Sequence, residues 1–220
     1  MRDGITRADF SRMIAGAAAL IRTQHAMLSQ LDCASGDGDH GTTMLRAVER
    51  LETCFGAGSP EDLTACLREA GWSVLGVDGG ASSSLLGTFF GGMADAPAGG
   101  VSIGARDLAA IFEAGLAAVR KQTKAQPGDK TLMDALVPAV TALRAATDSG
   151  KSIIEALRDA ASAARAGAEA TRNLTARYGR AKFLGEKTRG HQDPGATSMS
   201  LLFEGFSNGL EESKGESGNA

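Results

Sequence analysis

The stretch RADFSRMIAGAAALIRTQHAMLSQ, residues 7–30, repeats apolar side chains at steps of three and four residues. This spacing puts those side chains on one face of a helix, which predicts that the face packs against other helices. They are Phe10, Met13, Ile14, Ala17, Ile21 and Leu28. Similar patterns, separated by turns rich in Gly, Pro, Ser and Asp, predict further helices along the chain. These cover residues 44–54, 59–77, 85–93, 105–124, 131–146, 151–178 and 194–206.

The composition supports a helical protein with a hydrophobic core. Hydrophobic residues make up 43% of the 220, aromatic residues only 5%, and Ala, the strongest helix former, is abundant. The alternating Val, Ile and Thr runs that are typical of strands are few. We therefore expect an all-α, single-domain barrel or bundle of eight helices over residues 1–210, with its Gly-rich turns gathered at one end. The Ser/Gly/Glu-rich tail at 211–220 is expected to be disordered.

Charge, hydropathy and cysteine usage exclude several classes of protein. The net charge is −3, so the surface repels a polyanion overall and broad nucleic-acid binding is not expected. No apolar run reaches the roughly 18 residues needed to cross a bilayer, and the N-terminus has no apolar signal core. Cys33, Cys54 and Cys66 are odd in number and lack the CxxC spacing of a zinc site. We expect a reduced, cytoplasmic protein.

The turn LDCASGDGDHG, residues 31–41, is the most informative segment for function. Its three aspartates, Asp32, Asp37 and Asp39, alternate with glycines that permit a tight reversal of the chain. At about 4 Å, two such carboxylates repel by roughly 4 kcal/mol at an effective dielectric near 20. Protons or hard cations must relieve this repulsion, and oxygen ligands select Mg²⁺ or Ca²⁺. The spacing is not that of an EF-hand. A solvated loop, or a structural Ca²⁺ site on a helical scaffold, remains open.

Three other turns could bind an anion at the start of a helix, and each could equally be a plain connection. They are GGASSS at 79–84, PGDKT at 127–131 and GHQDPGATS at 190–198. In the last of these, Asp193 and Pro194 have the residue types of an N-cap and a first helical position. The sequence GKS at 150–152 is not a P-loop, because Ala145 stands where the first glycine would be. No hydrolase triad is indicated.

Taken in order, these turns resemble the L subunit of dihydroxyacetone kinase, over about residues 5–210. The matching motifs are GDGDHG at 36–41, GGAS at 79–82, GDKT at 128–131, GRA at 179–181 with LGE at 184–186, and GHQDPGA at 190–196. The resemblance implies an eight-helix barrel that binds ADP or ATP at one end. It implies that Asp32, Asp37 and Asp39 hold two Mg²⁺ ions that bridge to the phosphates. The positions implied for nucleotide binding are His40, Gly41, Thr42, Thr43, Ala81, Ser82, Ser83, Gly128, Thr131, Leu132, Arg180, Asp193, Pro194 and Gly195.

Within this resemblance, Ser82 and Ser83 are expected to donate to phosphate, and no residue is assigned a catalytic role. The implied activity is phosphoryl transfer through Mg-bound nucleotide to dihydroxyacetone, which a separate K subunit holds, so the chain alone is expected to be inactive. The GHQDPGA motif is similar to the phosphotransferase-system type, in which a phosphohistidine protein recharges bound ADP. Thr43, in the run GTT, is more similar to ATP-dependent members. An ATP-dependent kinase of a related ketose such as erythrulose, and a regulatory module that docks a transcription regulator, remain alternatives. The oligomeric state is open, a homodimer included.

Overall fold

The computed structural model describes residues 4–34, 36–56, 58, 62–96 and 102–216, and most of them are helical. The α-helices are α1 (Arg7–Cys33), α2 (His40–Phe55), α3 (Leu63–Leu75), α4 (Gly80–Met93), α5 (Ala105–Gln122), α6 (Met133–Asp148), α7 (Ile153–Ala170) and α8 (Pro194–Glu216). Two 3₁₀ helices, η1 (Thr171–Asn173) and η2 (Arg180–Thr188), join α7 to α8. The two-residue strands β1 (Gly4–Ile5) and β2 (Ile103–Gly104) pair antiparallel, a small addition to the expected fold.

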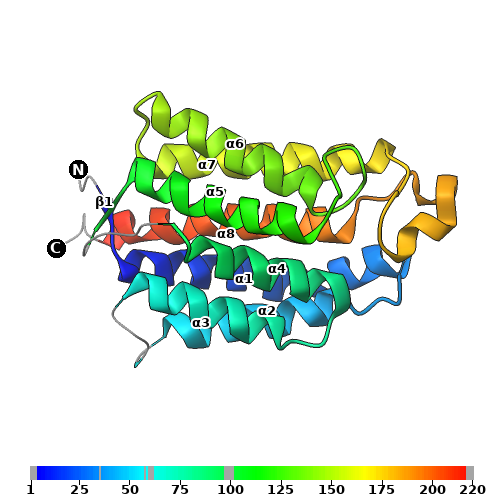
Figure 1. The fold of residues 1–220 in the computed structure, drawn as a ribbon, viewed down its shortest axis with the longest axis horizontal. Coiled ribbons are helices and arrows are strands. Elements are labelled where there is room, and N and C mark those ends of the chain that lie inside the picture. Colours follow the sequence, from blue (N-terminus) through cyan, green and yellow to red (C-terminus); the bar gives the residue numbers. More distant parts are fainter. Residues whose placement is uncertain (1–3, 35, 57, 59–61, 97–101, 217–220) are drawn as a thin grey trace.

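The helices run alternately up and down and close into a ring. Each helix packs against its neighbours in the chain, and α1 packs against α8 (Figure 1). Because the directions alternate, α2, α4, α6 and α8 all begin at one end of the ring, the right-hand end in Figure 1, beside η2. The strand β1 and the end of α8 lie at the opposite end. The all-α prediction is confirmed.

The core is a continuous apolar interior with a chain of aromatic rings. All six side chains of the residue 7–30 pattern are buried, as the spacing predicts. Phe112 of α5 contacts Phe89 of α4 and both Phe203 and Phe206 of α8, with ring centroids 5.6–5.9 Å apart. Such ring pairs add roughly 1 kcal/mol each beyond their buried area. Within the described ranges, no helix combines the length and the apolar character needed to span a membrane.

Glycines let neighbouring helices approach until their backbones touch. Along the α1–α8 contact, a Cβ atom added to Gly205 would lie 2.2 Å from the Cα atom of Ala17. Between α3 and α4, a Cβ atom added to Gly71 would lie 2.6 Å from the Cα atom of Gly91. A side chain at Gly205 or Gly71 would therefore push two helices apart.

Two helix starts come earlier than expected: α2 begins at His40 rather than 44, and α4 begins at Gly80 rather than 85, so most of the expected turn at 79–84 is helical. Two helix ends also differ, and tertiary contacts explain both. The long helix expected over 151–178 ends at Ala170, because Thr171 is buried and its hydroxyl accepts from the backbone N–H of Asp193, which turns the chain. The final helix, expected to end near residue 206, continues to Glu216. There Glu211 accepts hydrogen bonds from Arg158 and Ser207. Residues 211–216, expected to be disordered, are thus helical.

The remaining expectations at chain ends and turns fall on residues without a description. Residues 217–220 of the expected disordered tail and the expected start of the third helix at 59–60 lie outside the described residues. The described part of that helix begins at Leu63, and the Asp62 side chain accepts from the backbone N–H groups of Thr64 and Ala65.

We predict that Gly205→Ala lowers the free energy of unfolding by about 1–3 kcal/mol, because its methyl group meets the backbone of α1. The matched control is Gly91→Ala in α4, where a Cβ atom would make only an ordinary contact at 3.8 Å. That change should stabilise the protein by up to about 1 kcal/mol through helix propensity. Denaturant unfolding of both variants measures the difference. Equal effects would contradict the close approach of α1 and α8.

Candidate functional site

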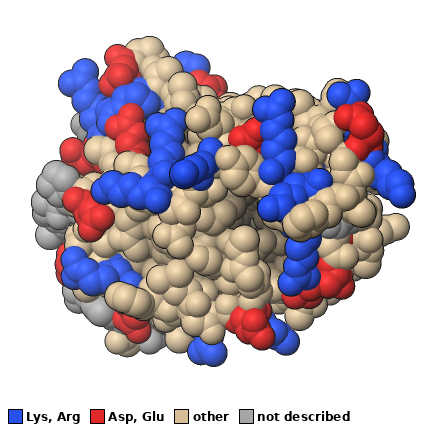
Figure 2. Space-filling view, turned by 45° about the vertical axis from the view of Figure 1, so that its right-hand side comes forward, with Lys and Arg blue, Asp and Glu red and all other residues tan. Residues whose placement is uncertain are grey.

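A cavity of about 530 Å³ opens at the end of the ring where the even-numbered helices begin. Its lining comes from the end of α1, the starts of α2, α4, α6 and α8, the loop after α5, and residues 178–181. Figure 2 turns this end toward the viewer and shows Lys and Arg side chains around a hollowed, mostly uncharged region. The size lies within the usual range for small-molecule sites.

The cavity brings together most of the residues that the sequence singled out. Twelve of them line it, from six separate segments: Asp32, Asp37, Asp39, His40, Ala81, Ser82, Thr131, Leu132, Arg180, Asp193, Pro194 and Gly195. Five do not line it: Gly41, Thr42, Thr43, Ser83 and Gly128.

Three of these five, Thr43, Ser83 and Gly128, lie behind the lining residues and help to fix the shape of the cavity. Thr43 is buried and fills the space beside Gly79, where a Cβ atom would lie 2.1 Å from the Thr43 methyl carbon. Ser83 is also buried, and its hydroxyl donates to the backbone carbonyl of Gly80 rather than toward the cavity. Gly128 has φ +98°, and its N–H donates to Asp134 at 2.6 Å. These contacts hold the starts of α4 and α6 in place.

The three aspartates of the acidic turn converge. One carboxylate oxygen each from Asp32, Asp37 and Asp39 lies within 4.8 Å of the other two. One oxygen of Asp32 also accepts from the backbone N–H groups of Gly38 at 3.0 Å and His40 at 3.3 Å. Gly38 adopts φ +79°, a conformation that favours glycine. Oxygen atoms at this spacing could bind a hard divalent cation.

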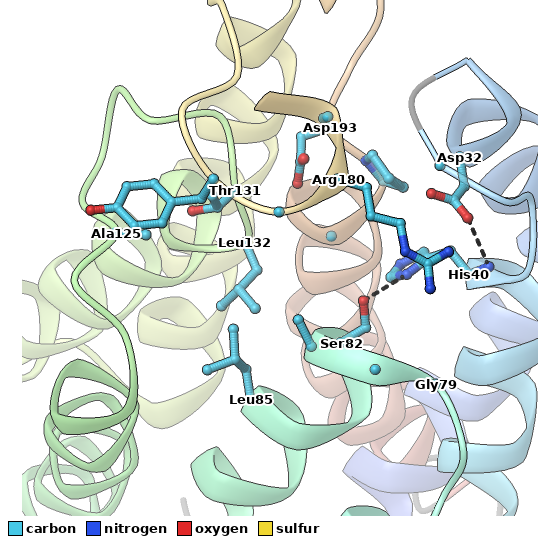
Figure 3. A pocket seen from close by; sticks show the side chains of 18 of the residues that line it. Asp32, His40, Gly79, Ser82, Leu85, Ala125, Thr131, Leu132, Arg180 and Asp193 are labelled. Atoms are coloured by element: carbon cyan, nitrogen blue, oxygen red, sulfur yellow. Dashed lines mark hydrogen bonds between the residues drawn. The ribbon is translucent and has the colours of Figure 1, made fainter. Parts of the chain in front are cut away.

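A positively charged side chain that is distant in the sequence pairs with one of these three aspartates. The guanidinium of Arg180, in η2, donates to the carboxylate of Asp37. Both side chains are about half exposed or more, so the pair is solvated. It nevertheless places one cation beside three carboxylates, at the edge of the cavity next to His40 (Figure 3).

His40 forms a buried hydrogen-bonded bridge between α2, α4 and α8. Its Nδ1 lies 3.1 Å from the Ser82 hydroxyl and its Nε2 lies 3.0 Å from the Ser198 hydroxyl (Figure 3). Burial lowers the pKa of His40, opposed by the charge of Asp32 and a backbone hydrogen bond to Pro194, so the ring is neutral at pH 7.

The neutral ring of His40 has one N–H, and the hydrogen bonds of Ser198 show which of the two ring nitrogens carries it. The Ser198 hydroxyl donates to the backbone carbonyl of Gly195 at 3.0 Å, so it accepts from Nε2–H of His40. Nδ1 is then the acceptor, and the Ser82 hydroxyl donates to it. In this arrangement Ser82 offers lone pairs to the cavity. Its expected donation to a phosphate would require the Ser82 hydroxyl to turn its proton away from Nδ1 of His40.

Backbone N–H groups are therefore the donors that remain at the start of α4. Among the described residues, the N-cap residues of α2, α4 and α6 make no side-chain cap hydrogen bond. At the opposite end of the ring, α1, α3 and α7 are capped by Thr6, Asp62 and Ser152. Gly104 of α5, at that opposite end, is also uncapped, and at the cavity end the first N–H groups of α2 and α6 donate to Asp32 and Thr131. The start of α4 is thus the helix start best suited to attract an anion, because it carries partial positive charge and its N-cap Gly79 has no side chain.

A buried ionic cluster supports the other wall of the cavity. Lys130 adopts φ +60°, unusual for a residue with a side chain, and its Nζ donates to the backbone carbonyls of Thr171 and His191. Asp134 accepts from the backbone N–H groups of Gly128 and Thr131. Burial raises the pKa of Asp134 and lowers that of Lys130. The loop before α6 is thereby tied to the segment that precedes α8.

Asp193 directly precedes α8, and its pKa departs clearly from the usual value of an aspartate. Its carboxylate accepts from the backbone N–H of Ala196 at 2.7 Å, as an N-cap does. Desolvation raises the pKa of Asp193 to about 7, against the opposing effect of that hydrogen bond and of Lys130.

The sequence reasoning missed part of the cavity lining. The residues that it did not single out are Asp78, Leu85, Thr123, Ala125, Met133 and Tyr178. Leu85 could have been found, since it lies one helical turn beyond Ala81 and so shares its face. Thr123 and Ala125 follow α5 with no recognisable motif. In Figure 3, Leu85 and Leu132 face each other across the cavity, away from Asp32 and His40.

Comparison with known proteins places this arrangement among related chains. Residues 34–208 match the family described as the DAK2 domain. The PEP-dependent dihydroxyacetone kinase ADP-binding subunit DhaL of Escherichia coli K12 is 36% identical over 185 residues, covering 84% of this chain and 88% of the relative. The corresponding subunit of kinase 1 from Listeria innocua is 39% identical over 185 residues, covering 83% and 86%.

Larger single-chain enzymes match only in part. The L-erythrulose 1-kinase of Mycolicibacterium smegmatis is 37% identical over 188 residues, which are 81% of this chain and 31% of that enzyme. The crystal structure of the C. freundii dihydroxyacetone kinase with AMP-PNP and Mg²⁺ superimposes with a TM-score of 0.70 at 25% identity. That match covers 93% of this chain and 34% of the kinase, so this chain corresponds to about a third of it.

We predict that Asp193 makes the protein less stable as the pH rises from 4 through 7. The unfolded carboxyl loses its proton near pH 4, whereas the folded one holds it to about pH 7. Asp193→Asn keeps an N-cap acceptor and cannot ionise, so it escapes this penalty. The free energy of unfolding of the variant minus that of wild type should therefore be roughly 3 kcal/mol larger at pH 8 than at pH 4. Denaturant unfolding at pH 4, 6 and 8 measures it, with Asp62→Asn as the control N-cap. Parallel pH curves for wild type and Asp193→Asn would contradict the raised pKa.

Proposed function

We propose, from the premise that this chain belongs to the DAK2 domain family, that it is the ADP-binding subunit of a dihydroxyacetone kinase of the phosphotransferase-system type. One observation carries the proposal: three carboxylates and the uncapped starts of three helices line one cavity. The carboxylates attract cations and the helix starts attract anions. A nucleotide polyphosphate with bound Mg²⁺ presents both kinds of charge.

The two sides of the cavity suit the two ends of such a nucleotide. Asp32, Asp37 and Asp39 would hold Mg²⁺, two ions in our proposal, and the backbone N–H groups of Ala81 and Ser82 would donate to phosphate oxygens. The apolar side, where Leu85 and Leu132 face each other, would receive the base. The C. freundii kinase, solved with AMP-PNP and Mg²⁺, is a relative that accommodates the same pair of ligands.

The bound nucleotide supplies the phosphoryl group, and the chain's own residues position it. Arg180 stands at the cavity edge, where its guanidinium could bind phosphate oxygens once it leaves Asp37. His40 is neutral and bridged on both nitrogens, so it orients Ser82 and the start of α8 rather than exchanging protons with a substrate. Phosphoryl transfer needs mainly positioning and charge neutralisation, which this site offers.

A second subunit would hold the acceptor. The chain corresponds to about a third of the single-chain kinases that it matches, and it spans most of the length of the ADP-binding subunits. We infer that a K subunit carries dihydroxyacetone and that this chain is inactive without it. The Escherichia coli and Listeria innocua relatives, which this chain matches over most of their length, are named as PEP-dependent, and this favours recharging of ADP by a phosphohistidine protein over exchange with ATP.

Two further points belong to the same proposal. A cytoplasmic location suits the exposed cysteine Cys33, whose side chain is a thiol in the structure. A related ketose such as erythrulose is the second candidate for the acceptor, favoured by the 37% identity to the L-erythrulose 1-kinase.

We predict that ADP with Mg²⁺, at 100 times its dissociation constant, adds about 2.7 kcal/mol to the stability of the chain. For a domain of this size the melting temperature should rise by roughly 5–10 °C. Asp37→Asn should abolish most of the Mg²⁺-dependent part of this rise. The control is Asp78→Asn, which removes a charge from the same cavity but outside the cluster. Equal losses in both variants, measured by thermal unfolding, would contradict the assignment of the cluster.

We predict that Arg180→Gln changes the affinity for Mg²⁺ alone and the affinity for ADP with Mg²⁺ in opposite directions. Mg²⁺ alone should bind about two- to five-fold tighter, because a competing cation leaves Asp37, a solvated pair worth at most about 1 kcal/mol. ADP with Mg²⁺ should bind more weakly, because a guanidinium is lost from the phosphates. Calorimetry measures both, with Arg189→Gln, whose guanidinium pairs with Glu186, as the control. Weaker binding of Mg²⁺ alone would contradict the competition.

A further inference from the structure

The wall of the cavity contains a residue whose ring could pack against a flat ligand. Tyr178 is the only Phe, Tyr or Trp among the described residues that line the cavity. Its side chain is half-buried and packs against the apolar core. Within the described part of the chain, its hydroxyl makes no hydrogen bond and its ring stacks on no other aromatic ring. The surface that Tyr178 turns to the cavity is therefore available to a ligand.

Contacts of the preceding residue place Tyr178 on the apolar side of the cavity. The backbone N–H of Arg177 donates to the carbonyl of Asp129 at 3.1 Å, and its guanidinium donates to the Asp129 carboxylate at 3.3 Å. Asp129 lies shortly before Thr131 and Leu132, and both of these line the side of the cavity away from the acidic turn (Figure 3). Tyr178 therefore meets the cavity on the side where the proposed function puts the base.

The same segment reaches the acidic side of the cavity two residues later. Arg180 also lines the cavity, and its guanidinium donates to Asp37 of the acidic turn. Consecutive Cα atoms are about 3.8 Å apart, so the Cα atoms of Tyr178 and Arg180 are separated by at most about 7 Å. A ligand that extends from the acidic turn to the apolar side would lie beside both side chains. A nucleotide has this form, with charged phosphates at one end and a flat ring at the other.

Main-chain contacts hold the backbone that carries Tyr178. Besides the contact of Arg177, the N–H of Ala176 donates to the hydroxyl of Thr188 at 3.0 Å, and both Ala176 and Thr188 are buried. On the other side, Gly179 adopts φ +64°, a conformation that favours glycine. Because the segment is held in advance, a ligand that contacts Tyr178 orders little further chain, which limits the entropy lost on binding.

An aromatic ring adds a preference that the aliphatic part of the wall does not supply. Leu85 and Leu132 remove apolar surface of any base from water, and they favour one base over another only through its area. A ring that stacks on the base adds dispersion and electrostatic attraction between the two π systems. This attraction grows with the overlap of the rings, so a two-ring purine gains more from it than a one-ring pyrimidine.

We propose that the ring of Tyr178 stacks on the base of the bound nucleotide and makes the site prefer a purine to a pyrimidine. This inference rests on the proposed function, since it assumes that a nucleotide occupies the cavity with its phosphates at the acidic turn. Tyr178 is then a specificity-determining residue that acts on the base alone. The contacts of the phosphates and of Mg²⁺ do not involve it.

The test compares three ligands, each with Mg²⁺: ADP, CDP, and inorganic pyrophosphate, which has no base. In calorimetry on the full chain, Tyr178→Leu should bind ADP about 5- to 50-fold more weakly than wild type, as the loss of one stacked base does. The loss for CDP should be smaller, and the affinity for pyrophosphate should stay within about two-fold of wild type. Tyr178→Phe keeps the ring and should bind ADP within about three-fold of wild type.

The matched control is Phe183→Leu, which replaces an aromatic ring five residues further along the chain. That ring is 82% exposed and does not line the cavity, so the affinity for ADP should not change. Four results would each overturn the proposal: an unchanged affinity of Tyr178→Leu for ADP, an equal loss for pyrophosphate, an equal loss in Phe183→Leu, or no recovery in Tyr178→Phe.

Fluorescence gives a second readout, because Tyr178 and Trp72 are the only tyrosine and the only tryptophan of the chain. Trp72 is 72% exposed, so Trp72→Phe removes the tryptophan emission with little effect on the core. In that variant, ADP with Mg²⁺ should quench the tyrosine emission, whereas pyrophosphate with Mg²⁺ should not. Binding of ADP without quenching would place the ring away from the base and overturn the proposal.

The same titrations separate this inference from the proposed function. If wild type binds ADP with Mg²⁺ and Tyr178→Leu binds it equally well, the stacking proposal fails while the nucleotide site stands. If wild type binds neither ADP nor pyrophosphate in the presence of Mg²⁺, the proposed function itself fails, and the stacking proposal fails with it.

Discussion

Opposite charges meet at the open end of this barrel, and the rest of the site depends on keeping them together. Asp32, Asp37 and Asp39 approach within 4.8 Å, a distance at which their carboxylates repel one another strongly. In the structure, two backbone N–H groups donate to Asp32 and the guanidinium of Arg180 donates to Asp37, and both reduce this repulsion. Beside them, the starts of α2, α4 and α6 carry partial positive charge. A cation alone or an anion alone would satisfy half of this arrangement, whereas the metal-bound polyphosphate that we propose would satisfy all of it.

The alternating directions of the helices bring the acidic turn and the positive helix starts to the same end of the ring. Because neighbouring helices alternate in direction, every even-numbered helix begins at the same end, where the acidic turn also lies between α1 and α2. The glycine contacts make the ring tight, since Gly205 and Gly71 bring backbones together where any side chain would intervene. His40 then ties three of these helices together through Ser82 and Ser198. The geometry of the cavity thus follows from the packing of the helices rather than from a separate binding domain.

Much of the fold and most of the cavity lining could be predicted from the sequence, because both have local signals. The three- and four-residue spacing from Phe10 to Leu28 marks a buried helical face, and the Asp and Gly alternation at 36–39 marks a tight acidic turn. What could not be predicted depends on contacts between distant residues. Ala-rich sequence favours a helix past residue 170, yet Thr171 meets Asp193 and the chain turns there. Likewise, the role of Ser82 depends on Ser198, which acts through His40.

The central claim is that metal and nucleotide bind this cavity as one unit, and calorimetric titration of ADP into the purified chain tests it most directly. One titration is made in excess EDTA and the other in several millimolar Mg²⁺. The account predicts that Mg²⁺ tightens ADP binding by about ten-fold or more, and that ADP tightens Mg²⁺ binding by the same factor. The same ADP affinity in both solutions would contradict it.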